Sequence, residues 1–82
     1  MTDLEKRAVV ALRSVKIPEK LWHAQRAESL NMRLTLQPEA TLGLSERADM
    51  WFLVWRYRRQ IDDLVVIARA DQIVNGAMSL AF

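Results

Sequence analysis

The sequence predicts an all-α fold, a small bundle of three or four helices with a long helix in its C-terminal half. Apolar residues recur every three or four positions over most of the chain, as they do on the buried face of an amphipathic helix. The two prolines and two glycines lie between or after these periodic stretches. Only one short stretch alternates polar and apolar residues, and it has no second strand to pair with. At 82 residues, the chain is expected to form a single helical domain, residues 1–82.

The first helix is expected over residues 3–15. Thr2 and Glu5 have the spacing of a capping box, in which each side chain accepts a hydrogen bond from the other residue's backbone N–H. Apolar positions then follow at helical spacing: Leu4, Ala8, Ala11, Leu12 and Val15.

The second helix is expected from Pro18 to Asn31, because proline is well tolerated in the first turn of a helix. Residues 32–44 contain Pro38 and Gly43 and are expected to form a connector. Three apolar residues at its start, Met32, Leu34 and Leu36, alternate with polar ones and allow a short extended piece.

A long helix is expected over residues 46–74, with Ser45 as its N-cap and Asn75-Gly76 as its C-terminal stop. Its length, roughly 30 residues, is unusual for a globular domain. A break near Asp62-Asp63 is the alternative, and it would give four helices instead of three.

One face of this long helix carries apolar residues at alternating spacings of four and three. We expect this stripe to pack against the first two helices, or against a second copy of the chain in a homodimer. The stripe consists of Met50, Val54, Tyr57, Ile61, Leu64 and Ala68.

The opposite face is also apolar, since it carries Phe52, Trp55, Val66 and Ile73, with Trp51 at its edge. A helix that is apolar on two sides is usually buried on both. Two interpretations follow and both stay open. Either the helix breaks and folds back on itself, or the second face binds another protein.

Aromatic residues and arginine are the types most enriched in the hot spots of protein interfaces. The expected partner-binding residues are therefore Trp51, Phe52, Trp55, Arg56, Arg58 and Arg59. The alternative is a nucleic-acid-binding regulator that uses the same arginine cluster, with Arg47, Arg58 and Arg69 as a basic strip. Against it, the spacing of Arg58 and Arg59 from Asp62 and Asp63 allows intrahelical ion pairs.

Composition excludes several classes of function. There is no cysteine, and His23 is the only histidine, so we expect no metal, no cofactor and no catalytic residue. The N-terminus has no secretory signal, and no apolar run approaches the ~20 residues that span a bilayer. We expect a cytoplasmic protein that does not enter a membrane. The net charge of +2 is too small to indicate nucleic-acid binding by itself.

The segment Leu44–Ile61, LSERADMWFLVWRYRRQI, resembles a segment of small proteins from phages and mobile elements. The shared features are a leucine and a Ser/Thr before a helix that contains tryptophan and ends in RYRRQI. Trp22, ahead of residues 27–30, fits the same pattern. The resemblance implies no catalytic residues. It implies a small non-enzymatic module that binds a host protein as a modulator or inhibitor, a class that includes anti-CRISPR-type proteins.

Overall fold

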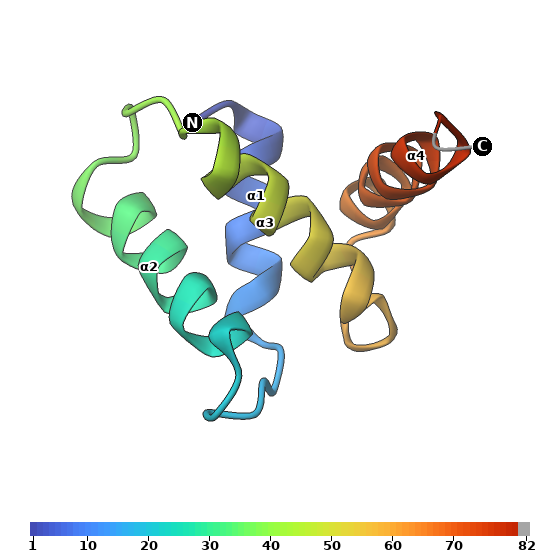
Figure 1. Cartoon of the computed structure of the whole chain (residues 1–82). Helices are drawn as coiled ribbons and strands as arrows, with labels where there is room; N and C mark the ends of the chain where they lie inside the picture. The colour runs from blue at the N-terminus through green and yellow to red at the C-terminus, as the bar shows by residue number, and fades with distance from the viewer. Residues whose placement is uncertain (81–82) are drawn as a thin grey trace.

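The computed structural model describes the backbone of residues 1–80 and the side chains of residues 1–76. Four α-helices follow one another, with a 3-10 turn after the third and no strand in this part of the chain (Figure 1). This arrangement confirms the predicted all-α bundle. The elements are α1 (Asp3–Arg13), α2 (Trp22–Leu36), α3 (Leu44–Arg56), η1 (Arg58–Gln60) and α4 (Leu64–Leu80).

The predicted capping box begins α1. The Glu5 N–H donates to Thr2 Oγ1 at 3.1 Å, and the Thr2 N–H donates to Glu5 Oε1 at 2.8 Å. These two bonds satisfy backbone N–H groups that have no partner inside the helix. The helix ends at Arg13, two residues before the predicted boundary.

The predicted bounds of α2 are wrong at both ends. Pro18 starts a turn in which the Leu21 N–H bonds the Pro18 carbonyl at 3.1 Å, and the helix begins only at Trp22. It then continues through the alternating stretch to Leu36. Met32 and Leu36 are four residues apart, so they share a solvent-exposed face of the helix. Pro38 disfavours the helical conformation at the residue before it, which explains the end.

The long helix of residues 46–74 is two helices. The chain leaves the helical conformation after Arg56, passes through η1 and reaches an extended Ile61. Asp63 then caps α4, since its Oδ1 accepts from the Val66 N–H at 3.3 Å and its carbonyl accepts from the Ile67 N–H at 3.1 Å.

Both predicted ends of this region are also wrong. Gly43, and not Ser45, is the N-cap of α3, where the Glu46 side chain accepts from the Gly43 N–H at 3.0 Å. At the other end, α4 runs through Asn75 and Gly76 to Leu80. One glycine lowers the stability of a helix by about 1 kcal/mol without having to end it.

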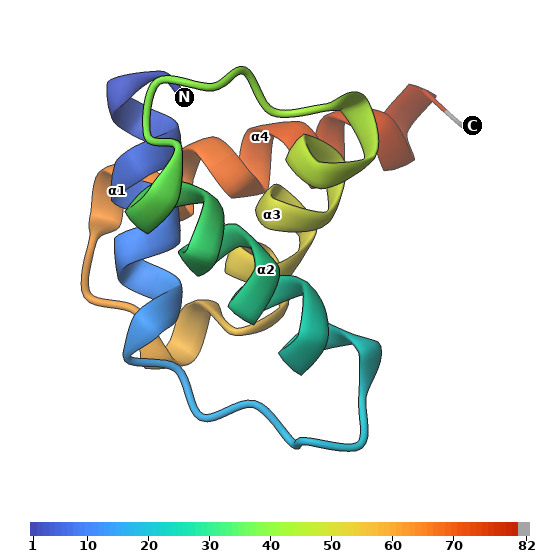
Figure 2. The ribbon, with the colours of Figure 1, turned by 90° about the vertical axis from the view of Figure 1, so that its left-hand side faces the viewer.

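Helix α3 lies at the centre of the bundle. It packs against α1 and α2 on one side and against α4 on the other (Figures 1 and 2). The break after α3 thus lets α4 fold back beside α3, and Trp51 at the edge of the second apolar face is buried while Phe52 and Trp55 stay partly exposed. This is the fold-back interpretation, and it explains why Leu53, Val54 and Trp51 are all buried although they point to different sides of α3.

The predicted apolar stripe is buried only as far as the break. Met50, Val54, Tyr57 and Ile61 belong to the core, whereas Leu64 is 77% exposed and Ala68 is exposed as well. The non-helical residues before α4 change its rotational phase relative to α3. Val66 and Ala70 therefore take the buried positions on α4.

Candidate protein-interaction surface

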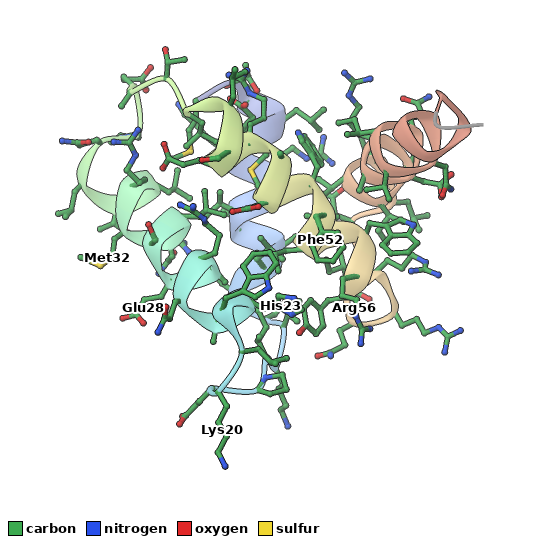
Figure 3. The ribbon with its side chains drawn as sticks, viewed as in Figure 1. Lys20, His23, Glu28, Met32, Phe52 and Arg56 are labelled. Atoms are coloured by element: carbon green, nitrogen blue, oxygen red, sulfur yellow. The ribbon has the colours of Figure 1, made fainter. Side chains whose placement is uncertain are left out.

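A cluster of aromatic side chains joins the start of α2 to the end of α3. The Trp22 and Phe52 rings stack with centroids 6.0 Å apart and an interplanar angle of 20°. His23 meets Phe52 edge-on at 5.8 Å, and Trp55 lies 6.4 Å from Phe52 on the other side. Figure 3 shows His23 reaching from α2 towards Phe52 and Arg56 on α3. Rings at such separations attract one another beyond the effect of area burial alone.

A hydrogen bond fixes this cluster to the core. His23 Nδ1 lies 2.7 Å from Tyr57 Oη, and the two rings meet edge-on at 5.6 Å. Tyr57 is buried, so the bond satisfies its hydroxyl group and holds the start of α2 beside the end of α3.

Two arginines lie on the rings at the end of α3. The Arg58 guanidinium carbon is 4.8 Å from the Trp55 ring centroid, and Arg58 Nη1 donates to the Trp55 carbonyl at 2.8 Å. The Arg56 guanidinium carbon is 5.5 Å from the Tyr57 centroid. Both distances are within the range of cation–π attraction. Because η1 reverses the chain after Arg56, Arg58 can lie back on the last turn of α3.

Half of this cluster faces solvent. Trp22 is 49% exposed, and Phe52, Trp55, His23 and Arg58 are partly exposed. Single exposed apolar residues are common on protein surfaces, whereas a contiguous group of partly exposed rings is typical of an interaction site. We call this region the aromatic–arginine surface. It consists of Trp22, His23, Phe52, Trp55, Arg56 and Arg58.

Two hollows border the aromatic–arginine surface. One, of about 300 Å³, lies beside Trp22 and is closed on one side by the 2.9 Å ion pair between Arg26 and Asp49. The other, of about 430 Å³, is lined by residues 56–60, which include three arginines. The first hollow adjoins the α2 end of the surface, and the second adjoins its η1 end.

The end of the molecule next to this surface is rich in unpaired cations. The α1–α2 connection and the η1 turn both lie there (Figures 1 and 2), joined by a 2.9 Å hydrogen bond from the Lys16 N–H to Gln60 Oε1. Within the described side chains, none of the cations at this end forms an ion pair with a carboxylate. We call this region the basic end; it consists of Lys16, Lys20, Arg56, Arg58 and Arg59.

The structure brings most of the predicted contact residues together. Phe52, Trp55, Arg56 and Arg58 belong to the aromatic–arginine surface, and Arg59 lines the adjoining hollow. Trp51 does not belong, because it is 4% exposed and lies in the core. One residue along the helix turns a side chain by about 100°, and this separates Trp51 from Phe52.

Two members of the surface escaped the sequence analysis. Trp22 lies off the main apolar stripe of α2. This position could have indicated a surface role, because a tryptophan outside the stripe does not face the core. His23 entered the sequence analysis only as the single histidine, for which no metal-binding or catalytic role is expected. Only the tertiary structure shows that both side chains meet the end of α3, some 30 residues further along the chain.

The predicted ion pairs of Arg58 and Arg59 are replaced by another pairing. Asp63 accepts two hydrogen bonds from Arg7 of α1, at 2.9 and 3.0 Å. The predicted basic strip is also interrupted, since Arg47 bonds Glu5 at 2.7 Å near the other end of α3 and Arg69 lies on α4. Five of the cations that form no ion pair among the described side chains belong to the basic end; the others are Arg13 and Arg69.

No group of three or more metal-ligating side chains occurs among the described residues. In the same part of the chain, no helix combines the length and the apolar character needed to cross a membrane. No protein-family model matches the chain, and comparison with curated proteins and with solved structures finds no match either.

Proposed function

We propose that this chain is a small, non-enzymatic protein-interaction module that binds a partner protein through the aromatic–arginine surface. The observation that supports the proposal best is the half-exposed ring cluster with arginines packed on it. Tryptophan, tyrosine and arginine dominate the binding energy at interfaces. The aromatic side chains bury a large area at a small cost in conformational entropy.

The order of the surface before binding favours tight association. The rings are already packed on one another, and Arg58 is held on Trp55 by both its ring contact and its bond to the backbone. Side chains that are fixed in advance lose less entropy when a partner binds. The two bordering hollows could each accept a side chain of the partner.

The role as a modulator or inhibitor of a host protein is part of the same proposal and comes from the resemblance of residues 44–61 to phage and mobile-element proteins. A module of this size acts by covering a surface of its target. In this proposal the partner is a host protein in the cytoplasm, and self-association through exposed α4 residues such as Leu64 is an additional state.

Nucleic-acid binding is the second candidate function, and the basic end is the observation that favours it. Lysine and arginine that are free of carboxylates can neutralise phosphates. Against it, the net charge of the whole chain is only +2, and Trp55 already carries Arg58 on its ring.

The test is retention from a host-like cell lysate, treated with nuclease or left untreated, on the tagged wild-type protein and on two variants. Trp22→Ala combined with Arg58→Ala removes an exposed ring and a cation from the surface. Leu36→Ala is the matched control, because Leu36 is an exposed apolar residue at the far end of α2.

We expect a discrete protein that survives nuclease treatment and is retained by the wild type and by Leu36→Ala, but reduced about tenfold or more on the double variant. Circular dichroism would verify that all three proteins are folded. Equal retention on the double variant would refute the site assignment. Loss of all bound material after nuclease treatment would favour the nucleic-acid candidate.

A further inference from the structure

The charge of the basic end is not balanced locally. Residues 16–20 and 56–59 contain five cations and one carboxylate, Glu19, and Asp62 follows three residues after Arg59. All five ion pairs of the described side chains lie elsewhere and use other cations. The net charge of the whole chain is only +2, so this end carries a local excess that the rest of the molecule offsets.

The shape of the basic end suits a flat anionic group. Arg56, Arg58 and Arg59 line one hollow of about 430 Å³, and Arg58 is oriented by its contacts with Trp55. A guanidinium presents N–H donors in a planar fork that matches the two oxygens of a carboxylate as well as those of a phosphate. The Lys16–Gln60 hydrogen bond keeps the α1–α2 connection beside this hollow.

The neighbouring chemistry favours a carboxylate on a peptide over a phosphate on a nucleic acid. The basic end is continuous with the rings of Trp22 and Phe52, because Arg56 and Arg58 belong to both regions. A peptide offers apolar side chains to those rings and carboxylates to the arginines. A nucleic acid would present a phosphate at every nucleotide, which a chain with a net charge of only +2 matches poorly.

We propose that the partner presents an acidic segment whose carboxylates lie on the basic end and whose apolar side chains pack on Trp22 and Phe52. This inference rests on the proposed function and adds the chemistry of the partner to it. The segment carries several Asp or Glu residues interspersed with aromatic or aliphatic ones, since the two regions of the surface are adjacent.

The test uses a library of displayed random 12-residue peptides, selected on the immobilised full chain. Peptides enriched on the wild type are then synthesised, and their Kd values are measured for the wild type and for the variants Trp22→Ala, Arg59→Glu and Arg69→Glu. Arg59→Glu reverses a charge of the basic end, and Arg69→Glu reverses an equally exposed charge on α4. A single-stranded 12-nucleotide DNA is measured in parallel.

The expected result is enrichment of acidic peptides with at least one aromatic residue. Their Kd should rise about tenfold or more with Arg59→Glu and less than about twofold with Arg69→Glu. Replacing their Asp and Glu by Asn and Gln should abolish binding.

Each other outcome overturns the inference in a way that identifies the cause. If the enriched peptides are neutral or basic and their binding is lost with Trp22→Ala, the aromatic–arginine surface would still be the binding site. The acidic character of the partner would be refuted. If no peptide is enriched and the protein binds the DNA in a way that Arg59→Glu weakens, both the protein-interaction proposal and the acidic partner would be wrong. The function would then be nucleic-acid binding. If Arg59→Glu and Arg69→Glu weaken peptide binding equally, the peptides respond to the net charge of the protein and not to the basic end.

Discussion

The three tryptophans show how the position of one residue decides its role. Trp51 on α3 is 4% exposed and lies in the core. Trp55 is partly exposed beneath Arg58, and Trp22 is 49% exposed. Sequence analysis placed Trp51 and Trp55 in one contact set because Trp55 lies on the second apolar face and Trp51 at its edge. Residues four apart share one side of a helix, so their different burial comes from their position along α3. Trp55 lies in the last turn of the helix, whereas Trp51 lies one turn further into the bundle.

We expect this difference to appear in acrylamide quenching of fluorescence from three variants, each with one tryptophan replaced by phenylalanine. Trp22→Phe should remove the largest quenchable fraction and Trp51→Phe the smallest, because quencher reaches a ring in proportion to its exposure. If Trp51→Phe removed the most accessible signal, the burial of α3 described above would be wrong.

The loss of stability on substitution should distinguish the buried Trp51 from the exposed Trp22. Trp51→Ala is expected to lower the free energy of unfolding by about 3–5 kcal/mol, because it leaves a cavity in the core. Trp22→Ala, on the exposed surface, should cost about 1 kcal/mol or less, mostly from its lost contact with Phe52. Urea unfolding monitored by circular dichroism measures both, and equal costs would contradict the assignment of Trp22 to the surface.

At the level of elements, the decisive feature is the break between α3 and α4. No proline or glycine occurs between Arg56 and Leu64, so the usual sequence signals of a helix end are missing. The signal that is present is Asp63, which caps the first turn of α4 and also binds Arg7 of α1. Sequence analysis noted a break near Asp62-Asp63 as an alternative, and the packing of α4 against α3 decides in its favour.

Asp63→Ala is expected to lower the melting temperature by on the order of 5 °C, because the first turn of α4 loses its cap and Arg7 loses its partner. Asp62→Ala is the matched control. Asp62 is exposed and has no ion pair among the described side chains, so its loss should leave the melting temperature almost unchanged. Differential scanning calorimetry of the two variants would make the comparison, and equal shifts would argue against the capping role.

At the level of the whole molecule, ion pairs connect helices that are distant along the chain. Glu5 of α1, which is buried, bonds Arg47 of α3 at 2.7 Å, and Arg7 of α1 bonds Asp63 at the start of α4. Burial alone would raise the pKa of Glu5. The Thr2 backbone N–H and Arg47 outweigh it, and they lower the pKa below the ordinary value of 4.5. The pKa of Asp63 is also lowered, below 3.8, because the bonds from Arg7 and the Val66 N–H outweigh desolvation.

These shifts predict a loss of stability in acid. A carboxyl group whose pKa is lower in the folded chain binds protons more readily when the chain is unfolded. Its contribution is complete above the ordinary pKa and is lost as the pH falls through the lower, folded value. The urea midpoint should therefore stay level down to about pH 4.5 and fall below it.

Glu5→Gln should lower stability at pH 7 by about 1–2 kcal/mol and reduce the fall in acid, because the variant has no proton to bind at this position. Glu28→Gln, an exposed residue with no ion pair among the described side chains, is the control and should follow the wild type at every pH. Parallel acid profiles of wild type and Glu5→Gln would contradict a lowered pKa at Glu5.

The sequence by itself determined the helical class, the capping box of α1 and the two apolar faces of residues 46–61. Each of these depends on residues within a few turns of one another, so spacing alone reveals it. The tertiary structure decided that α4 folds back over α3, that Trp51 is core and that Trp22 and His23 join Phe52 at the surface. These outcomes depend on contacts between separate elements, α3 with α4 and α2 with α3, and local periodicity carries no information about which element covers a given face.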